Sequence, residues 1–281
     1  LPNGKVVRNT GLTTYLIDVQ NEATLTLDHI IIDGGGEMFP ALKTGSACGA
    51  MLYLESGTEL VLNEGTVVQN CVHGSTTAAI YANSNCKVTV NDGVRIVNND
   101  GAFTGGIIAG AGCEITINGG DVTAIGGVNN FGENSHRVLS GNGIGPYESG
   151  SVIINGGTVK ATAKGEGFGI GGARIYNTGA MTVTINGGEI EATANHNNAA
   201  IGDKGNGKSG VTINGGVIHA VGKGGAAGIG SKGDIRITGG ELTVSAEGSG
   251  AAIGGFTDSY SERVDCKSIT INGNAIKSIS S

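Results

Sequence analysis

The sequence is poor in the residues from which ordinary globular cores are built. Tryptophan is absent, aromatic residues make up 4% and charged residues 15% of the 281 positions. So few large side chains exclude a conventional core of interlocking aromatic and aliphatic groups. Proline occurs only three times and the glycines follow no three-residue period, which excludes a collagen-like triple helix.

Basic clusters are also missing. The net charge is −7 and no run of lysines or arginines occurs, so binding to nucleic acid or to anionic membranes has no electrostatic support. No apolar run approaches the roughly 18 residues of a membrane-spanning helix, and residues 1–9 lack the hydrophobic segment of a signal peptide. We therefore expect no membrane insertion, with targeting signals missing or removed.

Cysteine usage indicates neither a zinc site nor a disulfide framework. The five cysteines are an odd number without CxxC spacing. Cys86 and Cys113 each stand five residues before the asparagine of a repeat, which predicts that they lie one strand spacing apart, ~4.8 Å. Because the Cβ atoms of a disulfide approach to ~3.8 Å, we favour a stacked pair of buried free thiols over a disulfide.

Glycine, by contrast, accounts for 54 residues, and hydrophobic residues still make up 38%. One pattern recurs: an alternating apolar strand, an Asn-Gly-Gly turn, a second short strand, and a small-residue strand that ends in Ile-Gly. The turns align at the anchors Asp28, Asn63, Asn91, Asn118, Asn155, Asn186, Asn214, Thr238 and Asn272. The third strands align at Leu16, Leu52, Ile80, Ile108, Ile144, Ile170, Ile201, Ile229 and Ile253. Such repetition predicts the coils of a solenoid.

The alternation of side chains orients each strand. In residues 182–186, Val183 and Ile185 are predicted to face inward, and Asn186 to form a corner where stacked asparagines hydrogen-bond from coil to coil. The same rule places Ile190, Ala192, Ala227 and Ile229 inside and Glu191, Thr193, Gly228 and Gly230 outside. We therefore predict one all-β domain over residues 1–281, a single-stranded right-handed parallel β-helix of about nine coils with three short strands each.

Residues 183–190, 250–255 and 24–28 resemble the glycine-rich repeats of large surface and adhesin-like proteins of Firmicutes, within the pectate-lyase-like β-helix superfamily. The resemblance implies a bacterial, extracellular or surface-attached module, excised from a larger protein with flanking domains. Carbohydrate binders, adhesin stalks, lyases and glycosidases all occur among such proteins. A glycan or a host-surface polysaccharide is the implied partner.

The resemblance also directs attention to the third strand, where substrate clefts of the superfamily lie. Its outward positions from the fifth coil on are predicted to be Gly143, Gly145, Gly169, Gly171, Ala200, Gly202, Gly228, Gly230, Ala252 and Gly254. Pectinases that resemble this fold place aspartates, or an arginine with calcium-binding acids, on or beside this strand. Since this floor carries only small residues, we expect a non-catalytic binding module, with no cofactor and no metal; calcium is not indicated.

The expected groove is bordered by loops 33–49, 126–141, 172–180 and 255–267. The candidate ligand-binding residues are Tyr53, Tyr81, Glu133, His136, Arg137, Arg174 and Tyr176. If the chain is instead a polysaccharide lyase or glycosidase, the candidate catalytic residues are Glu133, His136, Arg137, Glu148 and Glu166. Tyr53 and Tyr81 form either a sugar platform or a structural ladder, and the loops are either recognition elements or solvated turns. A spacer without a ligand is a third interpretation.

Overall fold

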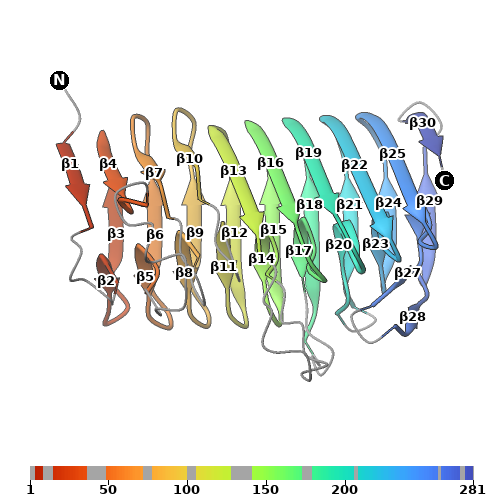
Figure 1. The fold of residues 1–281 in the computed structure, drawn as a ribbon, viewed down its shortest axis with the longest axis horizontal. Coiled ribbons are helices and arrows are strands. Elements are labelled where there is room, and N and C mark those ends of the chain that lie inside the picture. Colours follow the sequence, from red (N-terminus) through yellow and green to blue (C-terminus); the bar gives the residue numbers. More distant parts are fainter. Residues whose placement is uncertain are drawn as a thin grey trace.

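The chain winds repeatedly through three parallel sheets, so that each strand lies beside the strand one coil away (Figure 1). A computed structural model describes residues 4–8, 15–36, 49–71, 78–99, 106–127, 141–172, 179–205, 208–258, 261–272 and 276–280. Every regular element within these ranges is a strand, and no helix there is long and apolar enough to cross a membrane. With sheets of nine or ten strands, the predicted parallel β-helix is confirmed, with about nine to ten coils.

The strands of each sheet recur at one-coil intervals. Sheet A contains β1 (Gly4–Val7), β4 (Ile30–Asp33), β7 (Val67–Gln69), β10 (Arg95–Val97), β13 (Asp121–Gly126), β16 (Thr158–Ala163), β19 (Glu189–Ala194), β22 (Val217–Gly224), β25 (Glu241–Gly248) and β30 (Ile276–Ser280). Sheet B contains β2 (Ile17–Val19), β5 (Leu52–Leu54), β8 (Ile80–Ala82), β11 (Ile107–Ala109), β14 (Ile144–Pro146), β17 (Ile170–Gly172), β20 (Ala199–Asp203), β23 (Ala227–Ser231) and β26 (Ile253–Gly254). Sheet C contains β3 (Thr24–Leu27), β6 (Glu59–Leu62), β9 (Lys87–Val90), β12 (Cys113–Ile117), β15 (Gly150–Ile154), β18 (Met181–Ile185), β21 (Gly210–Ile213), β24 (Asp234–Ile237) and β29 (Ser268–Ile271). The antiparallel pair β27 (Phe256–Thr257) and β28 (Arg263–Val264) lies outside these sheets.

The alternation predicted for the first two strands of a coil is confirmed. In β18, Val183 and Ile185 are fully buried, and in β19 Ile190 and Ala192 are buried while Glu191 is exposed. The buried residues of successive coils form one continuous apolar cluster along the rod. Each coil therefore completes the core of its neighbours, which is how a chain with so few large side chains buries its apolar surface.

The asparagine column forms the predicted ladder. Each Nδ2 donates to the Oδ1 of the preceding coil at 2.8–2.9 Å from Asn91 through Asn214, and the Thr238 hydroxyl continues the series by donating to Asn214. The left-handed backbone of this turn falls on the second glycine rather than on the asparagine, with φ of 86° at Gly120 and 98° at Gly240. The asparagine is thus selected for its amide and the glycine for its backbone.

The buried column of sheet B departs from the prediction at two coils. Ile17, not Leu16, pairs with Leu52, and Ile107, not Ile108, pairs with Ile80. In both coils two apolar residues stand side by side, so the sequence pattern does not distinguish which of them enters the column.

A second correction concerns the corner before that column. Gly228, predicted to face outward, faces inward: a Cβ there would meet the core side chain of Val244 at 2.5 Å. Ala200 and Ala252 occupy the same position in neighbouring coils and pack in the core, whereas Ala227, predicted to be inside, lies on the outer face. The chain bends between strands here, so two consecutive residues face inward and strict alternation fails. The outer floor is therefore reduced to Gly145, Gly171, Gly202, Gly230 and Gly254.

Candidate functional site

The candidate residues of the sequence analysis divide into two groups. Glu133, His136, Arg137, Arg174 and Tyr176 lie outside the described residues, so their predicted roles stay predictions. Tyr53, Tyr81, Glu148 and Glu166 are described, and the first two lie together while Glu166 belongs to a separate cluster in the C-terminal half.

A tyrosine ladder, defined as Tyr15, Tyr53 and Tyr81, stands on the outer face of sheet B. Tyr53 and Tyr81 are in register on β5 and β8, and their ring centroids are 5.6 Å apart with an interplanar angle of 6°. Tyr15 stacks on the other side of Tyr53, at 3.8 Å and 8°. The stacking that a structural ladder requires is therefore present. Tyr15 was missed because it precedes β2, where Asp18 holds the register position opposite Tyr53.

This stacking decides which part of each ring is available to a ligand. Both faces of Tyr53 are occupied by its neighbours, so it cannot lie flat against a sugar ring; its edge and hydroxyl remain. Tyr15 is 36% exposed, and Tyr53 and Tyr81 are half-buried. The ladder therefore presents a row of ring edges and hydroxyls along the rod, rather than a platform of ring faces.

Burial and neighbouring groups raise the pKa values of Tyr53 and Tyr81. Burial, followed by the proximity and hydrogen bond of Tyr15, raises the pKa of Tyr53 to about 12. Burial, followed by Tyr15, Cys113 and Glu148, also raises the pKa of Tyr81. Glu55 acts on Tyr53 in the same way, so exposed carboxylates border the ladder at Glu55 and Glu148. Hydroxyl groups that donate or accept thus lie beside carboxylates that accept.

The C-terminal half of the same face is covered. The Phe168 and Phe256 rings meet edge to face at 5.9 Å and 87°, and both are 2% exposed. They form an outer apolar cluster with Ala199, Ala227 and Val264, and β27 and β28 carry Phe256 and Val264 onto the face (Figure 1). The expected open floor is therefore wrong here, because the aromatic cover occupies it.

Gly230 makes room for that cover. A Cβ at Gly230 would come within 2.6 Å of the Phe256 ring and 3.0 Å of the Ala227 Cβ. The absence of a side chain at Gly230 is thus explained by packing against an aromatic ring rather than by access for a sugar.

A buried ion pair fixes the segment that carries the cover. Lys204 Nζ contacts Asp258 Oδ2, with side-chain exposures of 10% and 1%. Asp258 Oδ1 also accepts the amide proton of Glu262 at 2.8 Å, which closes the loop between β27 and β28. Removing either charge would leave the other one buried, so this pair holds the hairpin against the rod.

Glu166 is the one described catalytic candidate in a partly buried setting. Its side chain is 15% exposed and its carboxylate lies 3.8 Å from His196 Nδ1. Burial raises the pKa of Glu166, His196 opposes that rise, and Asp258 adds to it. A general acid requires a raised pKa of this kind. The carboxylate of Asp258 is itself enclosed with Lys204.

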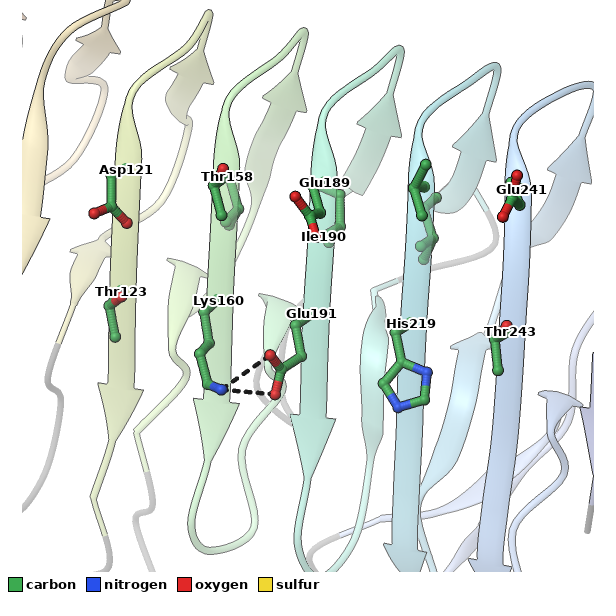
Figure 2. A pocket seen from close by; sticks show the side chains of 13 residues that line it. Asp121, Thr123, Thr158, Lys160, Glu189, Ile190, Glu191, His219, Glu241 and Thr243 are labelled. Carbon is green, nitrogen blue, oxygen red and sulfur yellow. Dashed lines mark hydrogen bonds and ion pairs between the residues drawn. The ribbon is translucent and has the colours of Figure 1, made fainter.

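Sheet A carries a shallow hollow of about 340 Å³ on its outer face. Figure 2 shows Lys160, Glu191 and His219 standing on neighbouring strands β16, β19 and β22, with Lys160 Nζ 2.8 Å from Glu191 Oε1. The two partners are 52% and 50% exposed, which is typical of solvated surface pairs. No group of three or more potential metal ligands occurs in the part of the chain that the structure describes.

Besides Asp258, two more buried carboxylates were not among the predicted site residues. Asp33 is 4% exposed: burial acts to raise its pKa, but Lys5 at 2.8 Å, Gln69, the Gly35 amide and Asn70 together lower it to about 2. Asp203 is fully buried, and burial raises its pKa to about 6 although it accepts a 2.5 Å hydrogen bond from Ser231. The difference is that Asp33 has a cationic partner, whereas the partners of Asp203 among the described residues are hydroxyl and amide donors.

Comparison with known proteins supports the repeat architecture. A model described as Beta helix repeat matches residues 115–146, 152–174, 183–206 and 211–234. Each matched stretch begins in a strand of sheet C and passes through sheet A to sheet B, so it corresponds to one coil. No curated protein and no solved structure matches the chain. These matches name an architecture and no activity.

Proposed function

We propose that this chain is a non-catalytic extracellular or surface-attached module that binds a neutral or cationic glycan along the tyrosine ladder. The observation that carries the proposal is the row of stacked, edge-exposed phenols on a rigid parallel sheet. Ring edges and hydroxyls suit the mixed apolar and polar surface of a sugar. The carboxylates of Glu55 and Glu148 beside the ladder accept hydrogen bonds from sugar hydroxyls and repel acidic polymers.

The shape of the site sets the expected affinity. The ladder lies on an open face, so a bound sugar stays largely solvated and a single site is expected to bind with a Kd of about micromolar to millimolar. Several copies of the chain on one surface would bind a polymeric glycan more tightly than a single copy, because their binding sites act together. Such avidity is expected for an adhesin or stalk.

Two matched double variants test the proposal. Tyr53→Ala with Tyr81→Ala removes the ladder, whereas Tyr53→Phe with Tyr81→Phe keeps the stack and removes two hydroxyls. On an array of neutral and cationic glycans, we expect the alanine pair to lose retention and the phenylalanine pair to weaken it at least several-fold. The acidic polymers pectin, alginate and mucin should be retained weakly even by the wild-type chain. Glu191→Lys on sheet A serves as the control that retains binding.

The competing functions give different results in the same assay. Retention that survives loss of the ladder contradicts the proposed site, and absence of retention for the wild-type chain favours a spacer. Release of products favours a lyase or glycosidase. For that second function the supporting observation is the raised pKa of Glu166, and Glu166→Gln is then expected to abolish product formation without altering retention.

A further inference from the structure

The cysteines at positions 86 and 113 form a pair inside the rod. Cys113 begins β12 and Cys86 directly precedes β9, and the Glu114 amide donates to Cys86 O at 3.0 Å, so the two residues occupy the same place in adjacent coils. Both are 1% exposed and carry free thiols. The predicted stacked pair of buried thiols is therefore confirmed.

The contacts show that the two sulfurs approach closely. The Cys86 amide donates to Cys113 Sγ at 3.3 Å, and the two thiols are hydrogen-bonded to each other. Each sulfur also lies close to a carbonyl oxygen of the preceding coil: Cys86 Sγ is 3.0 Å from Glu55 O, and Cys113 Sγ is 2.6 Å from Asn83 O. Both side chains thus point towards the preceding coil, which places Cys113 Sγ close to Cys86.

The backbone spacing permits a covalent link, for which the two Cβ atoms must move to ~3.8 Å from each other. In-register residues of adjacent parallel strands have Cα atoms ~4.8 Å apart, within the range of ~4.4–6.8 Å that disulfides span. The cysteines are 27 residues apart in sequence, so a bond between them would close one complete coil. We propose that Cys86 and Cys113 are the site of an inter-coil disulfide that forms upon oxidation by a peroxide and locks two neighbouring coils together.

The reaction has two steps. The Cys86 thiolate attacks one peroxide oxygen, which breaks the O–O bond, gives a sulfenic acid and releases water with the thiol proton. Cys113 then attacks the Cys86 sulfur, the S–O bond breaks, and the Cys113 proton leaves with the hydroxyl as a second water. One hydrogen peroxide accepts the two electrons. The order of attack follows from the shared hydrogen bond, which lowers the pKa of Cys86, while that contact and burial raise the pKa of Cys113.

The test uses the whole chain, incubated with hydrogen peroxide or refolded in its presence. Peptide mapping without reductant is expected to reveal one cross-linked Cys86–Cys113 species, lighter by two hydrogens and reversed by dithiothreitol. The melting temperature should rise by roughly 5–10 °C on oxidation, because the disulfide lowers the conformational entropy of the unfolded chain. Burial predicts faster reaction during refolding than in the folded state.

Two serine variants make the result specific. Cys113→Ser should abolish the cross-link and leave Cys86 as sulfenic or more highly oxidised acid, whereas Cys71→Ser should leave the cross-link intact. Cys71 is an equally buried thiol whose Sγ donates to Ala78 O at 3.6 Å. Absence of the cross-link in the wild type, or pairing of Cys86 with any cysteine other than Cys113, overturns the proposal. The wild-type peptide map decides the matter even if Cys113→Ser fails to fold.

Discussion

The outer face of sheet B is covered by aromatic side chains in different ways at its two ends. In the N-terminal coils, the strands supply their own aromatic residues, and the tyrosines cover the face by stacking on one another. In the C-terminal coils, the corresponding positions Gly202 and Gly230 carry no side chain. The β27–β28 hairpin brings Phe256 onto the face, where it meets Phe168, which lies just before β17. The first arrangement leaves ring edges exposed, whereas the second excludes solvent. One end thus has accessible ring edges and the other is closed by apolar packing, and the recognition that we propose belongs to the first.

The largest expected effect comes from the buried column that runs beneath both regions. Ile201 is fully buried between Ile170 and Ile229, so Ile201→Asp places an unpaired charge in the shared core. We expect it to lower the free energy of unfolding by more than about 4 kcal/mol. Chemical denaturation measures the loss. Glu191→Lys, on the solvated face, should cost less than about 1 kcal/mol, and equal losses for the two variants would contradict the assignment of inside and outside.

Removing the Phe256 ring from the outer face of sheet B is expected to have the next largest effect on stability. Phe256→Ala empties a closed apolar site and should cost about 3–4 kcal/mol. Hydrogen exchange at residues 256–264 should accelerate while the Asn ladder stays protected. Tyr81→Ala, at the edge-exposed end, should cost only about 1–2 kcal/mol. A similar loss for both substitutions would remove the distinction between a closed and an open end.

The buried carboxylates of Asp203 and Asp33 should make the stability of the two ends of the rod depend on pH in opposite directions. The raised pKa of Asp203 means that the folded state prefers the protonated acid, so stability falls by about 3 kcal/mol as the pH rises from about 4 to about 6. Asp203→Asn should remove this fall and stabilise the chain above pH 6. The lowered pKa of Asp33 has the opposite sign: its contribution of about 2 kcal/mol is present above pH 4 and is lost as the pH falls towards 2. Unfolding curves of Asp203→Asn and Asp33→Asn between pH 2 and 8 should therefore diverge.

The smallest effect is expected from the tyrosine hydroxyls. Tyr53→Phe preserves the ring stack, so its free energy of unfolding should stay within about 1 kcal/mol of the wild type. Ultraviolet pH titration should lose the phenol that ionises near pH 12. A loss comparable to that of Tyr53→Ala would mean that the hydroxyl, rather than the stacked ring, carries the stabilisation.

Much of the architecture was predictable because a solenoid repeats its local rules. Alternation in residues 182–185 placed Val183 and Ile185 inside, and the recurring Asn-Gly-Gly placed the ladder, since each depends only on neighbours in sequence and on the coil above. The equivalent positions of Tyr53 and Tyr81 followed from the same period. Where the pattern offered two adjacent apolar residues, as at Ile107 and Ile108, periodicity had no means of choosing between them.

The closed part of the face was decided by the tertiary structure alone. Phe168 and Phe256 lie 88 residues apart in sequence and meet only because a hairpin outside the repeat folds back over the rod. Asp203 likewise acquires its raised pKa from burial beside Ser231, in the next coil. The sequence by itself determined the coil, because its periodic contacts are local; which coils stay open and which are covered depends on contacts between irregular segments, which no period encodes.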